Sequence, residues 1–65
     1  MTTLGERVEE LRGLAIRRGV ADQVGDQPDP GLAIQAYAVA LGFDPALAFD
    51  LELSLQELEQ FSALI

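Results

Sequence analysis

The sequence contains no cysteine, no histidine and no lysine in its 65 residues. The absence of cysteine excludes disulfide bonds and thiolate zinc sites. The absence of histidine removes the commonest metal ligand and the usual general base near neutral pH. Without histidine or lysine, the chain lacks the basic side chains that usually activate a hydroxyl group as a nucleophile. We therefore expect a protein that is not an enzyme and that holds neither a metal nor an organic cofactor.

The acidic residues are the remaining candidates for acid–base chemistry or cation binding. Asp50 and Glu52 are near neighbours, but two acids in a short loop are typical of solvated surface. Asp22, Asp26 and Asp29 follow one another at spacings of four and three residues. This spacing differs from that of calcium-binding loops, and helix capping and loop solvation explain these residues more simply. We assign them no catalytic or metal-binding role.

The chain is short and rich in apolar residues. Its 65 residues form one domain at most, and we treat residues 1–65 as a single small domain. Hydrophobic residues make up 49% of the sequence, which is too apolar for a disordered chain with a net charge of −7. A single core of this size leaves only about 3–5 kcal/mol of net stability. Because self-association would bury surplus apolar surface, we expect a homodimer or another homo-oligomer.

Positive charge is confined to the beginning of the sequence. Residues 1–18 have a net charge of +1, whereas residues 19–65 have a net charge of −8. The positive side chains are Arg7, Arg12, Arg17 and Arg18. The acidic balance favours basic partners and disfavours contact with a phosphate backbone, so we expect no direct nucleic-acid binding. An acidic chain can instead mimic nucleic acid and inhibit a basic protein by occupying its groove.

No stretch of the sequence predicts export or membrane insertion. The N-terminal stretch MTTLGERVEEL lacks the basic region and the following apolar run of a secretory signal. The most apolar stretch, residues 31–43, is shorter than the roughly 20 residues that cross a bilayer. We expect a cytoplasmic protein without a membrane span.

Capping residues predict the first helix at residues 4–18. Thr3 and Glu6 have the spacing of a capping box, and Gly19 suits the left-handed position that follows a helix. An apolar stripe at helical spacing consists of Leu4, Val8, Leu11, Leu14 and Ala15. In residues 20–29 the sequence leaves open whether a short helical turn forms before a glycine and two prolines break it.

Residues 31–43 predict a central helix that is apolar on nearly every side. Asp29 and Pro30 form a favoured helix start, and Gly42 a favoured end. One apolar stripe consists of Ile34, Tyr37, Ala38 and Leu41, and the other of Leu32, Ala36, Val39 and Phe43. A helix of this kind is normally buried on several sides, so we expect the other segments to pack around it.

Two shorter helices are predicted after the central helix. An Asp-Pro pair begins the first, at residues 44–50, and Phe49 is expected to cap the core. The second begins after the capping box formed by Ser54 and Glu57, and it runs over residues 55–64. With no strand or hairpin signal in the sequence, the fold class predicted is all-α: a compact bundle of three to four short helices.

The apolar side of the last helix is the best candidate for a partner contact. Apolar residues at such spacings on an exposed helix dock into grooves of other proteins, although burial in the chain's own core explains them equally well. The candidates are Leu55, Leu58, Phe61, Leu64 and Ile65, together with Tyr37 of the central helix. Tyr37 is either an interface anchor or a core residue with its hydroxyl at the core edge.

Part of the chain resembles a known family. Residues 19–47 are similar in layout to the leader domain of nitrogenase-associated-type precursors of ribosomally synthesised, modified peptides. The family's "IA…AGF/GYD" positions are taken by Ile34, Ala38, Gly42, Phe43 and Asp44, and residues 53–59 look like its "LS-x-x-ELE" helix. Gln60 to Ala63 stand where that family has a double-glycine cleavage site. The resemblance implies a helical leader recognised by a maturation enzyme through the helix from Ser54 to Glu59.

These observations favour a non-enzymatic, acidic helical protein that acts by binding another protein with a basic or apolar groove, as a regulatory adaptor or an assembly subunit. Two alternatives stay open: a leader-type domain of a modified-peptide precursor, and an acidic mimic of nucleic acid.

Overall fold

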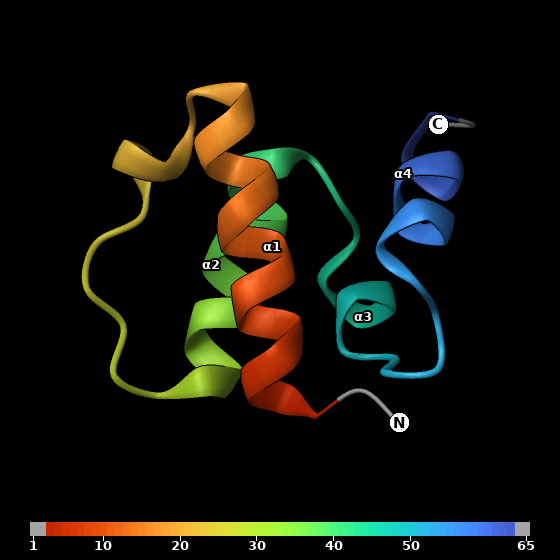
Figure 1. The fold of residues 1–65 in the computed structure, drawn as a ribbon, viewed down its shortest axis with the longest axis horizontal. Coiled ribbons are helices and arrows are strands. Elements are labelled where there is room, and N and C mark those ends of the chain that lie inside the picture. Colours follow the sequence, from red (N-terminus) through yellow and green to blue (C-terminus); the bar gives the residue numbers. More distant parts are fainter. Residues whose placement is uncertain (1–2, 64–65) are drawn as a thin grey trace.

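The computed structural model describes residues 3–63, and within this range the chain is helical without a strand (Figure 1). In chain order the helices are α1 (Leu4–Arg18), the short 3₁₀ helix η1 (Ala21–Gln23), α2 (Pro30–Leu41), α3 (Pro45–Ala48) and α4 (Leu55–Ala63). The all-α prediction is therefore confirmed. None of the helices in the described range has the length and apolar character needed to cross a membrane.

α1 and α2 lie side by side and run in the same direction, because the segment between them returns the chain to the starting end (Figure 1). α2 has 12 residues and is about 18 Å long at 1.5 Å per residue. Residues 24–29 cover a similar length, about 20 Å, when extended at about 3.3 Å per residue. Gln27 and Asp29 precede prolines, which disfavours helical backbone there. The open question about residues 20–29 is settled: η1 forms first and the extended return follows.

The helix ends follow the predicted capping residues. Backbone N–H groups donate to the side-chain oxygens of Thr3 (from Glu6, 3.1 Å), Asp29 (from Gly31, 2.8 Å), Asp44 (from Ala46, 2.9 Å) and Ser54 (from Glu57, 3.1 Å). The Glu57 carboxylate accepts from the Ser54 N–H at 3.3 Å, which completes the predicted capping box before α4. Gly19 and Gly42 adopt positive φ angles of 73° and 81° immediately after α1 and α2. These caps satisfy backbone groups that have no partner within a helix.

The hydrophobic core lies between α1 and α2 and continues to α3 and α4. Its fully or nearly fully buried members are Leu11, Leu14, Ala15, Ala33, Ile34, Ala38, Phe43, Ala48 and Leu58. α1 and α2 share the closest packing between any two elements, and alanines from both helices lie in this region. Small side chains allow two helix axes to approach closely, so this pair forms the centre of the fold.

The expected packing around α2 is confirmed in part: α1, η1 and α3 contact this helix, but one of its faces stays exposed. The stripe that contains Ile34 and Ala38 is buried, but Leu32 and Val39 of the second stripe are 54% and 64% exposed. The physical reason is the number of elements: within residues 3–63, α1, η1 and α3 are the elements with the most contacts to α2, and Leu32 and Val39 stay exposed beside an open groove. Phe49, expected to cap the core, is also 40% exposed.

Arg7, one of the four arginines near the start of the chain, lies inside the fold. Its side chain is 0% exposed, and its Nη2 donates to the carbonyl oxygen of Asp50 at 3.1 Å and to that of Leu53. The Nε and Nη1 atoms are buried without a hydrogen-bond partner among the described residues. Arg7 therefore joins α1 to the loop between α3 and α4, and within residues 3–63 no carboxylate pairs with this buried cation.

α4 lies at the side of the fold and approaches the other helices less closely than α1 approaches α2 (Figure 1). Leu58 is 1% exposed and anchors α4 in the core. At the other end of α1, Arg18 pairs with Glu59 at 3.6 Å and lies over the ring of Phe43, 5.8 Å from its centroid. α4 is thus held by the buried Leu58, the half-buried Leu55, a surface ion pair and the loop that Arg7 fixes.

Replacing Arg7 tests its structural role. We expect Arg7→Ala to lower the free energy of unfolding by about 2–4 kcal/mol, because two backbone carbonyls lose their donor and the buried stem is removed. Arg12→Ala is the matched control on the same helix: its side chain is 57% exposed, so its loss should cost less than about 0.5 kcal/mol. Urea denaturation followed by circular dichroism measures both. Equal stability of the two variants would contradict the role of Arg7.

Replacing glycine by alanine should change the free energy of unfolding in opposite directions at Gly13 and Gly42, because the two glycines have different backbone conformations. Gly13 lies inside α1, where an added Cβ would meet nothing within 4 Å, so Gly13→Ala should stabilise the fold by about 0.5–1 kcal/mol. Gly42 has a φ of 81°, so Gly42→Ala should destabilise it by about 1 kcal/mol. Thermal unfolding of both variants provides the comparison, and a stabilised Gly42→Ala variant would contradict the left-handed end of α2.

Candidate binding surface

The outer face of α2, formed by Leu32, Gln35, Ala36 and Val39, exposes two large aliphatic side chains, those of Leu32 and Val39. Together with Gln27 of the return segment, these residues line a shallow groove of about 350 Å³. The helix from Pro30 to Leu41 carries no charged side chain, so nothing charged interrupts this face. The elements that contact α2, which include α1, η1 and α3, leave this face open.

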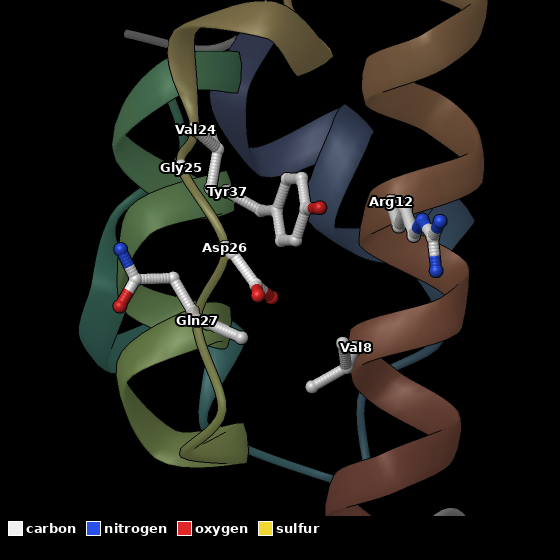
Figure 2. A pocket seen from close by; sticks show the side chains of 8 residues that line it. Val8, Arg12, Val24, Gly25, Asp26, Gln27 and Tyr37 are labelled. Carbon is white, nitrogen blue, oxygen red and sulfur yellow. The ribbon is translucent and has the colours of Figure 1, made fainter.

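A more enclosed pocket of about 250 Å³ adjoins this groove, since Gln27 borders both (Figure 2). Its lining comes from α1, from the return segment and from α2: Val8, Arg12, Val24, Gly25, Asp26, Gln27, Ala33 and Tyr37. Figure 2 shows the ring of Tyr37 extending from α2 towards α1, with the Asp26 carboxylate pointing into the same space and Arg12 on the opposite wall. Three polar side chains from three segments therefore border one pocket.

The charges around the pocket are largely solvated. Arg12 forms an ion pair with Glu9 at 3.9 Å, and both side chains are more than half exposed. Exposed pairs of this kind contribute little stability, about 0–1 kcal/mol, so Arg12 is free to rearrange towards a bound group. The pocket offers a cation, an anion and a phenolic hydroxyl to a ligand.

The residues proposed for partner binding differ in how far they are buried. Leu58 is 1% exposed, which agrees with the alternative of burial in the chain's own core. Leu55 is half-buried against the core, and Phe61 is 40% exposed. Tyr37 is half-buried and lines the pocket. Leu64 and Ile65 lie outside the described residues.

The sequence interpretation missed the outer face of α2 because it assigned both apolar stripes of this helix to the core. One signal was present: a chain of 65 residues supplies few helices, and a helix without any charge has no side that prefers water. Arg12 and Asp26 were assigned no ligand role, since nothing in their spacing indicates that α1 and the return segment enclose a pocket.

Several of the acidic side chains have local structural roles. Asp29, Asp44, Asp50 and Glu57 each accept a hydrogen bond from a backbone N–H within three residues. In the part of the chain that the structure describes, no group of three or more potential protein ligands is arranged to hold a metal ion. Of the three aspartates spaced by four and three residues, Asp29 caps α2 and Asp26 lines the pocket.

The chain matches no protein-family model, no curated protein and no solved structure.

Truncating the side chains of Leu58 and Phe61 to alanine tests which of these two α4 residues belongs to the core. Leu58→Ala should lower the free energy of unfolding by about 2–4 kcal/mol, because it removes a fully buried side chain and leaves a cavity. Phe61→Ala should cost less than about 1 kcal/mol, because the ring is partly exposed. The same denaturation measurement compares them, and a larger loss for Phe61→Ala would show that Phe61, and not Leu58, is the side chain that anchors α4 in the core.

Proposed function

We propose that this protein is a non-enzymatic binding module that docks on another protein chain through the outer face of α2. The observation that carries the proposal is the exposure of Leu32 and Val39, at 54% and 64%, on a helix without a charged residue. Large aliphatic side chains held on a rigid helix lose little conformational freedom when a partner covers them. Apolar patches bordered by polar groups mark protein interfaces.

The neighbouring pocket supplies the polar part of such an interface. Arg12, Asp26 and the hydroxyl of Tyr37 lie beside the apolar groove, in the position that a polar rim occupies around an interface core. Hydrogen bonds and charge pairs at a rim fix the orientation of a partner more than they raise affinity. Tyr37 thus keeps its proposed role as a contact residue, but beside the outer face of α2 and not beside the apolar side of α4.

The composition supports binding and not catalysis. The chain has no histidine, lysine or cysteine, and the polar groups of the pocket include no activated nucleophile. The alternative of a nucleic-acid mimic is weaker, because four of the carboxylates accept local backbone hydrogen bonds and are not held as a regular array of exposed charges.

One pair of variants tests the proposal directly. Val39→Lys places a cation on the outer face of α2, and Ile16→Lys places the same cation on α1, where Ile16 is 60% exposed. Both residues are β-branched, exposed and third from the C-terminal end of their helix, so the two variants have equal net charge and equal helix context. We expect a tagged Val39→Lys chain to lose stoichiometric partners that the wild-type and Ile16→Lys chains capture at high salt from the native host's lysate.

The salt dependence separates the remaining outcomes. Retention at high salt indicates apolar docking, whereas a partner that is lost at high salt from every variant would favour the acidic mimic. Capture that is equal for all three chains would remove the outer face of α2 from the proposal.

A second candidate function rests on α4. This helix is attached mainly through Leu58 and the Arg18–Glu59 pair, and it presents the exposed ring of Phe61. A peripheral helix of this kind is suited to recognition by an enzyme, as the resemblance to leader domains implies for the helix after Ser54. In the same capture experiment, loss of a maturation enzyme from a Phe61→Lys chain but not from the Val39→Lys chain would favour this candidate.

A further inference from the structure

We propose that the partner on the outer face of α2 is a second copy of the same chain, with the two α2 helices antiparallel about a two-fold axis. This inference rests on the proposed function, because it names the occupant of the same face. In this arrangement Leu32 of one copy faces Val39 of the other, and Gln35 and Ala36 lie next to the axis.

The charge distribution favours this face for self-association. Each chain has a net charge of −7, so most contacts between two copies bring acidic groups together. The helix from Pro30 to Leu41 is a long described segment without a charge, and pairing it with itself adds no like-charge contact within the helix. Antiparallel pairing also places the positive end of each helix dipole beside the negative end of the other.

The side chains on the outer face of α2 are complementary to themselves under a two-fold rotation. Leu32, Gln35, Ala36 and Val39 have spacings of three, one and three residues, the pattern of a contact face between helices. The order of side chains is large, polar, small, large, and rotation brings each large residue onto the large residue of the other copy. Ala36 beside the axis allows the two helices to approach closely, and Gln35 of one copy comes within reach of the backbone or Gln35 of the other. An isologous dimer requires this kind of self-complementary patch.

The size of the face sets the expected strength of the dimer. An interface of standard size covers about 800 Å² of each partner, roughly a fifth of the 4149 Å² surface of this chain. A helix about 18 Å long with its adjoining groove covers less than that. We therefore expect a reversible dimer that dissociates in the micromolar range.

Sedimentation equilibrium measures this association without a tag. For the wild type and for Ile16→Lys we expect the apparent mass to rise from that of the 7.0 kDa chain towards twice that value as concentration increases. Val39→Lys should raise the dissociation constant at least about tenfold, because a lysine would be buried against Leu32 of the other copy. A wild-type chain that stays monomeric up to about 1 mM, or a Val39→Lys chain that associates like the wild type, would overturn the inference.

Disulfide cross-linking tests the orientation, and the absence of cysteine in the chain removes any background. Ala36→Cys should form a disulfide-linked dimer under oxidation, since the two copies of this position meet at the axis. Leu32→Cys alone should not, because in the antiparallel arrangement its two copies are displaced by about 10 Å along the helices. A mixture of Leu32→Cys and Val39→Cys chains should give the mixed dimer. Cross-linking of Leu32→Cys alone would instead indicate parallel helices and would contradict the proposed arrangement.

The failure of this inference and the failure of the proposed function give different results. Suppose that the wild type is monomeric but captures a different protein, which Val39→Lys loses. The proposed dimer is then wrong, whereas the proposal that the outer face of α2 binds a protein is supported. If the wild type is monomeric and Val39→Lys captures the same proteins as Ile16→Lys, both are wrong.

Discussion

One buried cation connects the two ends of the described fold. The Arg7 guanidinium donates to backbone carbonyls 43 and 46 residues further along the chain, and it thereby fixes the loop between α3 and α4 against α1. This loop determines where α4 begins, and so it brings Leu58 over the core. A guanidinium stays charged in proteins, so its burial carries a desolvation cost that two carbonyl acceptors only partly offset. In a domain of marginal stability, the position of the last helix depends on this contact.

The binding surface is a consequence of how few helices the chain provides. α1 covers one side of α2 and α3 covers another, and the return segment 24–29 runs alongside without covering the outer face. The same segment closes the pocket that adjoins this face, because Pro28 within it and Pro30 directly after it disfavour helical backbone in the residues that precede them. The apolar groove and the polar pocket therefore have a common structural cause, and both belong to the surface for which we propose a protein partner.

The acidic residues of the chain have two effects, one on the separate helices and one on association. Four carboxylates satisfy backbone N–H groups at helix starts and turns, which stabilises the helices one by one and leaves the packing between them to apolar residues. The net charge of −7 then opposes non-specific association of the chain with itself. Two chains that each carry this negative charge can still associate where neither presents a charged residue. The outer face of α2 is such a surface, and the proposed dimer uses it.

Local signals in the sequence determined the helices of this protein, and tertiary structure decided which of their faces are buried. The starts of α1, α2, α3 and α4 and the left-handed glycines after α1 and α2 were predictable, because a cap depends on residues within a few positions of one another. The burial of Arg7, the exposure of Leu32 and Val39 and the burial of Leu58 were not. Each depends on which segment arrives from far along the chain: carbonyls of the α3–α4 loop for Arg7, the core for Leu58, and no described helix for the outer face of α2. Periodicity shows that a helix has an apolar side, but only the packing of distant elements shows what covers it.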